Sequence, residues 1–261
     1  MLSFDDKTAA TLEAMYLTPD VVAQRAQTIA LLAPQPGEHG LDIGVGPGLL
    51  AYDLSAMVGE SGRLVGIDIA PAMLTMARTR TANLPQTEIL EGRADRLDFP
   101  PESFDFAVSV QVHEYVAEVD TSLRALHRIL KPGGRFVILD TDWRSLVWHT
   151  QDQDRMDRVL ACWDRHLADP HLPATLGGRL GRAGFQTLAV EAIPMLAPTW
   201  QPHSYAAGIM QAIRRFVLDN GEKDGLDRAT VEAWYQEQMQ FAERGSFFFS
   251  VNRYAFLALK R

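Results

Sequence analysis

Cysteine is almost absent from this chain of 261 residues, in which Cys162 stands alone. One thiol cannot close a disulfide within the chain, and it cannot supply the paired thiolates of a structural zinc site. Long apolar runs are absent too, since no stretch reaches the roughly 18 uninterrupted apolar residues of a membrane helix. The opening MLSFDDK lacks the basic and apolar regions of a signal peptide. We therefore expect a protein of the reducing cytoplasm with no membrane segment.

Positive charge is also scarce, because 25 Lys and Arg stand against 33 Asp and Glu and give a net charge of −8. Proteins that bind nucleic acid obtain most of their affinity by neutralising phosphates with basic residues, so this balance argues against a nucleic-acid partner. The 19 Gly and 14 Pro match background usage and exclude collagen-like or low-complexity chains. The length fits one large domain, or one domain with an elaboration.

The first half of the chain alternates strand-like apolar runs with helical periods. Strands are expected at 40–44, 63–68, 87–91, 104–110 and 135–140, and helices at 21–32, 49–58, 72–82 and 120–130. Lys131-Pro132-Gly133-Gly134 is typical of a helix stop followed by a turn. Such alternation implies right-handed βαβ units, and therefore an α/β fold with a parallel sheet covered by helices on both faces.

The second half departs from this alternation. Helices are expected at 152–167, 172–183, 203–220 and 228–244, and strands at 185–195 and 247–259. The stretch from about 197 to 245 therefore interrupts the sheet pattern and is predicted to form a lid over whatever the sheet binds. The triplet Phe247-Phe248-Phe249 is expected to pack in the sheet or at a dimer contact.

The most informative segment is the loop of Gly44, Gly46 and Gly48 between a strand and a helix. Glycines at this spacing let the backbone turn sharply and let a ligand approach it closely. Asp68 ends the next strand, 24 residues after Gly44, where an acidic side chain is placed to bind the two hydroxyls of a ribose. A tight structural turn is the alternative for the loop taken alone.

The same loop departs from the dinucleotide fingerprint, because Leu49 stands where the third glycine should fall. Asp42, two residues before the loop, is a poor neighbour for a pyrophosphate and suits a ligand that carries an ammonium group. A ribose plus an ammonium, without phosphates, describes S-adenosylmethionine. A nicotinamide cofactor stays open as an alternative.

Residues from about 36 to 139 resemble a class I S-adenosylmethionine-dependent methyltransferase of the small-molecule kind, similar to those of ubiquinone and menaquinone biosynthesis. Five ordered motifs carry the resemblance, at 37–48, 65–74, 91–95, 104–105 and 130–134. The resemblance implies a Rossmann-like, doubly wound, seven-stranded and mostly parallel sheet whose last hairpin is antiparallel. It also divides the chain into capping helices at 1–35, a cofactor-binding domain at 36–195 and 246–261, and a helical lid at 196–245 inserted before the last strand.

Carried over to the glycine loop, the resemblance gives each residue a role toward S-adenosylmethionine. Gly44, Gly46 and Gly48 would line its homocysteine and sugar. Asp42 would face its amino group, in part through water, and Asp68 would accept hydrogen bonds from the ribose. A merely structural role is the alternative for both aspartates.

On the adenine side, the resemblance implies that Ile69 and Met73 pack on the ring. Ala94 and Asp95 would lie at its amino edge. Relatives usually carry Asp or Asn before that alanine, where this chain has Arg93. The edge hydrogen bond is therefore expected from Asp95 or from the backbone. Plain helix packing is the alternative for Met73, because methionine is a common gap-filler.

Three further residues complete the expected cofactor site. Gln111 follows the fourth strand and would lie beneath the cofactor. Tyr16 and Arg25 precede the sheet, where relatives fold a helix over the cofactor; the tyrosine would close the pocket and the arginine would hold the methionine carboxylate bidentately. A core tyrosine and a solvated arginine are the alternatives.

The acceptor side is less defined. His113 follows the fourth strand at the edge where a crevice opens, so it is our candidate catalytic base, with a loop histidine as the alternative. Glu114 is expected to be a solvated surface carboxylate. Asp140 and Asp142 could suggest a divalent metal, but the fourth strand is followed by Gln111 and His113 rather than by Asp, and no metal is predicted. Pocket walls for an apolar or aromatic acceptor are expected among Trp143, Trp148, His149, Trp200, His203 and Tyr205.

The sequence therefore predicts an enzyme that transfers a methyl group from S-adenosylmethionine to oxygen, nitrogen or carbon of a small molecule. Such transfer is an in-line displacement, for which the protein mainly aligns the acceptor and excludes water. The alternative is a protein that uses the same cofactor fold for another reaction, such as a cyclisation. A homodimer is a further expectation.

Overall fold

The capping segment of the computed structural model, which describes residues 6–261, consists of the helices α1 (Asp6–Tyr16) and α2 (Pro19–Leu32). Pro19 suits the first turn of α2 because that position needs no backbone N–H donor. The helix ends at Ala33, whose φ of 49° is left-handed and whose N–H caps the carbonyl of Ile29. Residues 1–5 of the predicted segment lie outside the described part.

The strands form one seven-stranded sheet over residues 6–261, in the order β3-β2-β1-β4-β5-β7-β6. The strands are β1 (His39–Ile43), β2 (Arg63–Asp68), β3 (Thr87–Glu91), β4 (Phe104–Val110), β5 (Leu130–Trp148), β6 (Phe185–Ala197) and β7 (Phe249–Lys260). The first five are parallel, and β7 pairs antiparallel with both β5 and β6. This confirms the predicted Rossmann-like sheet with an antiparallel last hairpin.

Helices cover both faces of the sheet. Side chains of α2, α3 (Leu49–Val58) and α4 (Pro71–Arg80) share one apolar core with alternate strand residues such as Phe106 and Val108. Those of α5 (Val119–Ile129) and α7 (Pro173–Arg182) share another with Phe104 and Ala107. Because β4 contributes side chains to both cores, it is apolar at successive positions, as expected of a strand buried on both faces.

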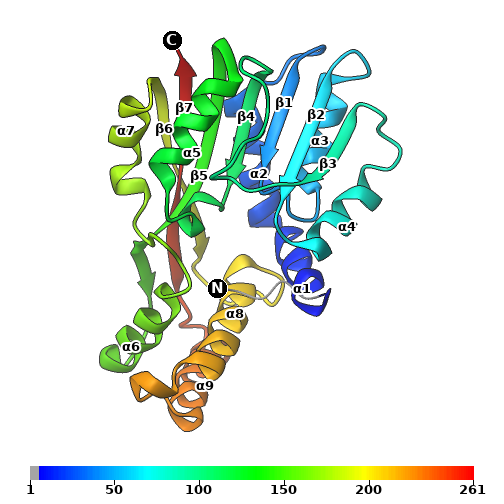
Figure 1. Cartoon of the computed structure of the whole chain (residues 1–261). Helices are drawn as coiled ribbons and strands as arrows, with labels where there is room; N and C mark the ends of the chain where they lie inside the picture. The colour runs from blue at the N-terminus through cyan, green and yellow to red at the C-terminus, as the bar shows by residue number, and fades with distance from the viewer. Residues whose placement is uncertain (1–5) are drawn as a thin grey trace.

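A third group of helices lies beyond one end of the sheet, below it in Figure 1. These are α6 (Gln153–Asp164), α8 (Tyr205–Asn220) and α9 (Arg228–Glu243), and the short 3-10 helix η2 (Glu222–Asp224) connects α8 to α9. A second 3-10 helix, η1 (His113–Tyr115), follows β4. Met156 of α6, Met210 of α8 and Trp234 of α9 belong to one buried cluster. The predicted lid began at residue 196, whereas α6, well before it, packs with the lid helices.

β5 is much longer than the predicted 135–140. It begins at Leu130, includes the Lys131–Gly134 segment as an irregularity in its pairing with β4, and continues to Trp148. The apolar pattern predicts an end near Asp140, but β7 is long enough to pair with the extension as far as Phe249. Among residues 6–261, no helix combines the length and apolar character that crossing a membrane requires.

Candidate active site

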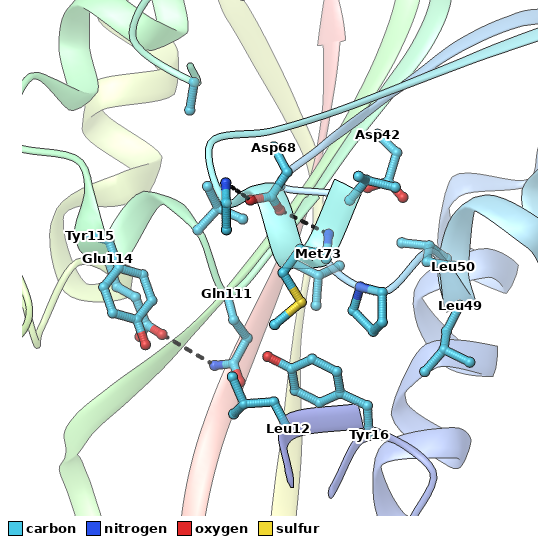
Figure 2. Close-up of a pocket in the computed structure, with 18 of the residues that line it drawn as sticks. Leu12, Tyr16, Asp42, Leu49, Leu50, Asp68, Met73, Gln111, Glu114 and Tyr115 are labelled. Atoms are coloured by element: carbon cyan, nitrogen blue, oxygen red, sulfur yellow. Dashed lines mark hydrogen bonds between the residues drawn. The ribbon is translucent and has the colours of Figure 1, made fainter. Parts of the chain in front are cut away.

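A cavity of about 430 Å³ opens where the parallel strands end. Strands β2 and β4 lie on either side of β1, so the connections on the two sides of β1 run in opposite directions across the sheet. Such a switch point leaves a crevice at the carboxyl ends of the strands. The walls come from α1, α2, the loops after β1, β2 and β4, and the helices α6 and α8, with Arg253 added from β7. Figure 2 shows several of these residues converging from separate elements.

The glycine loop lines part of this cavity, and its three glycines differ in how closely other residues pack against them. Gly44, Gly46 and Gly48 all have positive φ, at 72°, 53° and 81°. A Cβ on Gly44 would lie 2.2 Å from Val112, and one on Gly48 would lie 2.8 Å from the Cα of Ala77 in α4. Around Gly46 the nearest atom to such a Cβ lies 4.0 Å away.

Gly44 and Gly46 line the cavity, whereas Gly48 does not. The close approach to Ala77 shows that Gly48 allows α3 and α4 to pack, which departs from its predicted contact with the ligand.

The Asp68 carboxylate is fixed at the end of β2 by two backbone donors. Its Oδ2 accepts a hydrogen bond from the N–H of Gly46 at 2.9 Å, and its Oδ1 accepts one from the N–H of Ala70 at 2.9 Å (Figure 2). A carboxylate oxygen can accept more than one hydrogen bond. Asp68 can therefore hold the glycine loop and still accept hydrogen bonds from a ribose.

Asp42 is a buried carboxylate that lacks a full set of partners. Its side chain lines the cavity, only 2% of the residue is exposed, and its Oδ2 has no hydrogen-bond partner. Burial, with a contribution from the charge of Asp68, raises the pKa of Asp42 to about 7. A buried carboxylate without a partner fits a cationic ligand group, and the ammonium of S-adenosylmethionine is such a group.

The residues expected around the adenine line the same cavity. Ile69 is 51% exposed and so leaves apolar surface for a ring to cover, whereas Met73 is 3% exposed. Ala94 and Asp95 lie nearby, and Arg93 donates two hydrogen bonds to the Asp95 carboxylate at 2.8 and 2.7 Å. These bonds lower the pKa of Asp95, which stays ionised and oriented.

Tyr16 and Arg25 reach the cavity from the capping helices. Burial raises the pKa of Tyr16 to about 12, so its hydroxyl stays neutral and can donate a hydrogen bond. The Nε of Arg25 donates to the Asp53 carboxylate at 2.9 Å. Arg25 thus lines the cavity, as binding of the methionine carboxylate would require, but its guanidinium is already ion-paired with the Asp53 carboxylate.

Gln111 lines the cavity and has an unusual backbone conformation, with a φ of 56°. Its N–H donates to the carbonyl of Leu139 at 2.7 Å, and its side-chain Nε2 donates to the hydroxyl of Thr141. A non-glycine residue with positive φ is uncommon and persists where its surroundings fix it.

His113 contradicts its predicted role as the catalytic base. It is fully buried and does not line the cavity. Its Nδ1 lies 2.8 Å from the hydroxyl of Ser109, and its Nε2 lies 2.9 Å from that of Ser122. Burial lowers the pKa of His113 to about 4. With both ring nitrogens occupied, the histidine connects β4 to α5 and cannot reach an acceptor.

The prediction that Glu114 is a solvated surface carboxylate is also wrong. It is 2% exposed rather than solvated, and it lines the cavity. Its Oε2 accepts from the N–H of Thr141 at 3.3 Å, and burial raises its pKa to about 7.

Arg253, which is not among the predicted site residues, is 1% exposed and also lines the cavity. The alternation of Val251, Arg253 and Ala255 could have revealed it, because residues two apart in a strand share a face and the other two are apolar. Of the expected acceptor walls, Trp143 and Tyr205 line the cavity, and Trp148, His149, Trp200 and His203 do not.

Comparisons with known proteins agree with this geometry. A family model described as a methyltransferase domain matches residues 41–138. A demethylmenaquinone methyltransferase from Symbiobacterium thermophilum is 36% identical over 109 residues, which cover 41% of this chain and 43% of the relative. The chain spans 43% to 60% of the length of the first five curated relatives it matches.

Two solved structures share the fold over almost the whole chain. Phosphoethanolamine N-methyltransferase 2 from Haemonchus contortus, in complex with S-adenosylmethionine, is 20% identical with a TM-score of 0.63 and covers 98% of this chain and 57% of its own. The cyclase SpnF is 19% identical with a TM-score of 0.59 and covers 92% of this chain and 80% of its own. At these identities the likeness shows the fold.

The chain therefore carries a class I S-adenosylmethionine-dependent methyltransferase domain, and the resemblance found in the sequence is confirmed. S-adenosylmethionine is the cofactor of this domain, as predicted. The roles of the individual site residues stay predictions.

Proposed function

We propose that the protein transfers a methyl group from S-adenosylmethionine to a small, apolar molecule. The observation that carries the proposal is one continuous cavity with two unlike ends. One end holds the carboxylates of Asp42 and Asp68 beside the glycine loop, and the other is walled by Trp143, Trp163 and Ile209. A methyltransferase needs such a junction, because its charged cofactor and its acceptor must meet in line.

At the cofactor end, the chain supplies groups that match each polar part of S-adenosylmethionine. Asp42, buried without a full set of partners, would lie beside the ammonium, and Asp68 would accept from the ribose hydroxyls. Ile69 and Met73 would contact the adenine. When bound, the cofactor supplies a methyl group on a positively charged sulfur, which is already an electrophile, so the protein has mainly to orient the acceptor and exclude water.

At the acceptor end, the walls come from the lid and from the extension of β5. Trp143, Trp163 and Ile209 are buried, and Ala212 completes the apolar surface. Relatives named as demethylmenaquinone methyltransferases support a ring compound as the acceptor. The lid helix α8 and the helix α6 that packs against it would keep water from the reacting atoms.

A cyclisation that uses the same fold is the second candidate function, and it is favoured only by the shared fold of the cyclase SpnF. The discriminating experiment incubates the protein with S-adenosylmethionine and a library of small ring metabolites, followed by mass spectrometry. We expect a product heavier by one CH2 and an equal amount of S-adenosylhomocysteine. A product of unchanged mass without S-adenosylhomocysteine would overturn the proposal in favour of the cyclisation. A cytoplasmic location and a homodimer stay predictions from the sequence.

A further inference from the structure

Arg253 is a buried cation inside the cavity whose bonding capacity is not filled. Its Nη1 donates to the side-chain carbonyl of Gln24, and its guanidinium carbon lies 4.5 Å from the centre of the Tyr205 ring. Its Nε and Nη2 atoms are buried and have no hydrogen-bond partner. A guanidinium cannot lose its charge at any ordinary pH, so the three N–H bonds of these two nitrogens are left unsatisfied at a considerable energetic cost.

No carboxylate of the described residues forms an ion pair with Arg253, although ion pairs join many arginines elsewhere. The carboxyl of Glu114 lines the same cavity, where burial raises its pKa and the charge of Arg253 partly offsets that rise. A buried charge without a direct partner is strongly unfavourable, and a ligand that supplies an opposite charge relieves the cost. The cavity therefore holds a cation and a carboxyl with no direct bond between them.

The other titratable groups around this pair are held in their neutral forms. Burial raises the pKa values of Tyr16, Tyr115 and Tyr205, so these hydroxyls stay protonated and can donate hydrogen bonds to a ligand. Asp140 lies behind Glu114, where its Oδ1 accepts from the N–H groups of Val112 and Glu114, and burial raises its pKa well above the usual range. Glu114 is thus the acidic group of this cluster that is poised to exchange a proton near neutral pH.

We propose that Glu114 and Arg253 bind the methyl acceptor through an ionisable ring hydroxyl, with Glu114 accepting its proton and Arg253 stabilising the oxyanion. In this step the O–H bond of the acceptor breaks, its electron pair stays on the acceptor oxygen, and the proton bonds to the Glu114 carboxylate. The inference rests on the proposed function and names the chemical class of the acceptor, a phenol or an enol.

Charge balance favours a neutral hydroxyl over an acceptor that is permanently anionic. Before the proton moves, the cavity holds the Glu114 anion and the Arg253 cation, and afterwards it holds the acceptor anion and the same cation. The number of buried charges does not change. An acceptor that is already anionic would place two anions beside one cation unless Glu114 first took a proton from solvent, and burying an uncompensated charge is costly.

The test uses the protein saturated with S-adenosylhomocysteine and two ring compounds, 4-nitrophenol and nitrobenzene, which differ by one hydroxyl. We expect the protein to prefer 4-nitrophenol, and Arg253→Met to weaken that binding by roughly 10- to 100-fold while nitrobenzene binding stays nearly constant. Arg253→Lys, which keeps the charge, should restore part of the preference. Arg214→Met is the matched control, because Arg214 also lies over a tyrosine ring, that of Tyr235 at 4.4 Å, but outside the cavity.

Glu114→Gln tests the proton transfer, and it keeps an oxygen to accept from Thr141. In the wild-type complex the probe and Glu114 share one proton, so affinity for 4-nitrophenol should fall as the pH rises above about 7. Glu114→Gln should remove this fall, because the variant then binds the phenolate without a second anion. A structural role for either residue would weaken binding without changing the pH profile.

Equal affinity for the two compounds, binding of neither, or one pH profile for both proteins would overturn the inference. Failure of the proposed function would appear separately, as a product of unchanged mass and no release of S-adenosylhomocysteine from S-adenosylmethionine.

Discussion

The carboxylate of Asp68, at the end of β2, lies 2.9 Å from the backbone nitrogen of Gly46 in the loop after β1. The bond joins two segments that are both expected to contact the cofactor, since the loop would line its homocysteine and sugar and Asp68 would bind its ribose. Because the second oxygen of Asp68 accepts from the N–H of Ala70, the carboxylate is oriented without the ligand. Such preorganisation lowers the entropic cost of binding.

Asp42 should make cofactor binding depend on pH. Its pKa of about 7 means that the free protein carries a protonated Asp42 below pH 7, and binding an ammonium there must expel that proton. Affinity for S-adenosylhomocysteine should therefore fall by about tenfold for each pH unit below 7 and level off above it. Calorimetry across this range checks the slope, and Asp42→Asn should bind weakly with no slope. A wild-type profile that is flat would contradict the assignment.

Substitutions in the glycine loop should separate stability from binding. Gly48→Ala places a Cβ 2.8 Å from the Ala77 backbone, whereas Gly46→Ala meets nothing nearer than 4.0 Å. Both residues have positive φ and would be strained, by roughly 1–2 kcal/mol. Steric overlap should make Gly48→Ala the more destabilising by about 1–3 kcal/mol. Urea unfolding measures the difference, and equal losses for the two variants would rule out the packing role of Gly48.

His113 should affect stability and not the chemistry. The fall in its pKa from 6.5 to about 4 on folding means that the unfolded chain binds more protons between these values. Its contribution to stability is therefore lost as the pH falls from about 6.5 towards 4, by up to about 1.4 kcal/mol per pH unit. Unfolding of wild type and His113→Gln at several pH values should show a shallower dependence in the variant. Loss of methyl transfer by a well-folded His113→Gln would restore it as a catalytic candidate.

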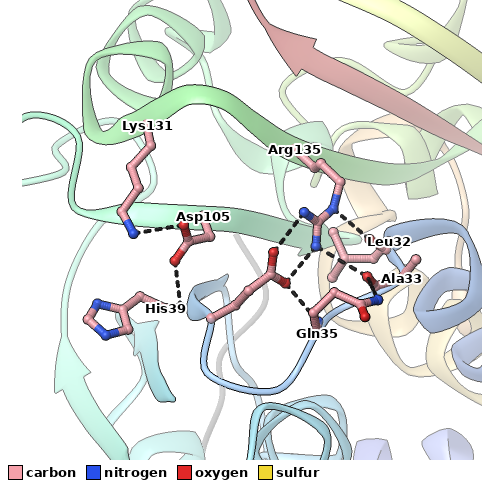
Figure 3. A network of polar contacts seen from close by, with 8 residues as sticks. Leu32, Ala33, Gln35, His39, Asp105, Lys131 and Arg135 are labelled. Atoms are coloured by element: carbon pink, nitrogen blue, oxygen red, sulfur yellow. Dashed lines mark hydrogen bonds and ion pairs between the residues drawn. The ribbon is translucent and has the colours of Figure 1, made fainter. Parts of the chain in front are cut away.

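An ion pair at the opposite end of the strands provides a control for effects on binding. Arg135 donates to both carboxylate oxygens of Glu38, at 2.9 and 2.7 Å, and its Nε donates to the carbonyl of Leu32 at 2.9 Å (Figure 3). Arg135→Leu should destabilise the fold by about 1–3 kcal/mol, because the partly buried Glu38 loses its partner. Affinity for S-adenosylhomocysteine should not change. Parallel unfolding and calorimetry would reveal any coupling to the site.

The elements that depend on local patterns could be predicted from the sequence. The limits of β2, β3, β4 and α3 match their expected ranges, because apolar runs and flanking glycines mark them directly. The loop from Gly44 to Gly48 was also recognisable, since positive φ at closely spaced positions requires glycine. The extension of β5 was not recognisable, because it depends on pairing with β7, more than a hundred residues later.

The charged groups of the acceptor end were hidden for a similar reason. Glu114 lies in the turn after β4, where a carboxylate is ordinarily exposed, and its burial beside Thr141 depends on the long β5. Arg253 becomes a cavity residue because β7 inserts between β5 and β6. His113 was misassigned because it follows the right strand, but its ring turns to Ser109 and Ser122. The position of a residue after a strand predicts that it lies at the edge of the sheet, but it does not predict where its side chain points.

Calorimetric titration of S-adenosylmethionine into wild type and Asp68→Ala tests the central claim most directly, with Glu88→Ala as the control for a carboxylate outside the cavity. We expect one site in the wild type, a loss of roughly 1.5–3 kcal/mol in Asp68→Ala, and no loss in the control. Wild-type affinity retained by Asp68→Ala, or binding of NAD in place of S-adenosylmethionine, would contradict the assignment of this cavity.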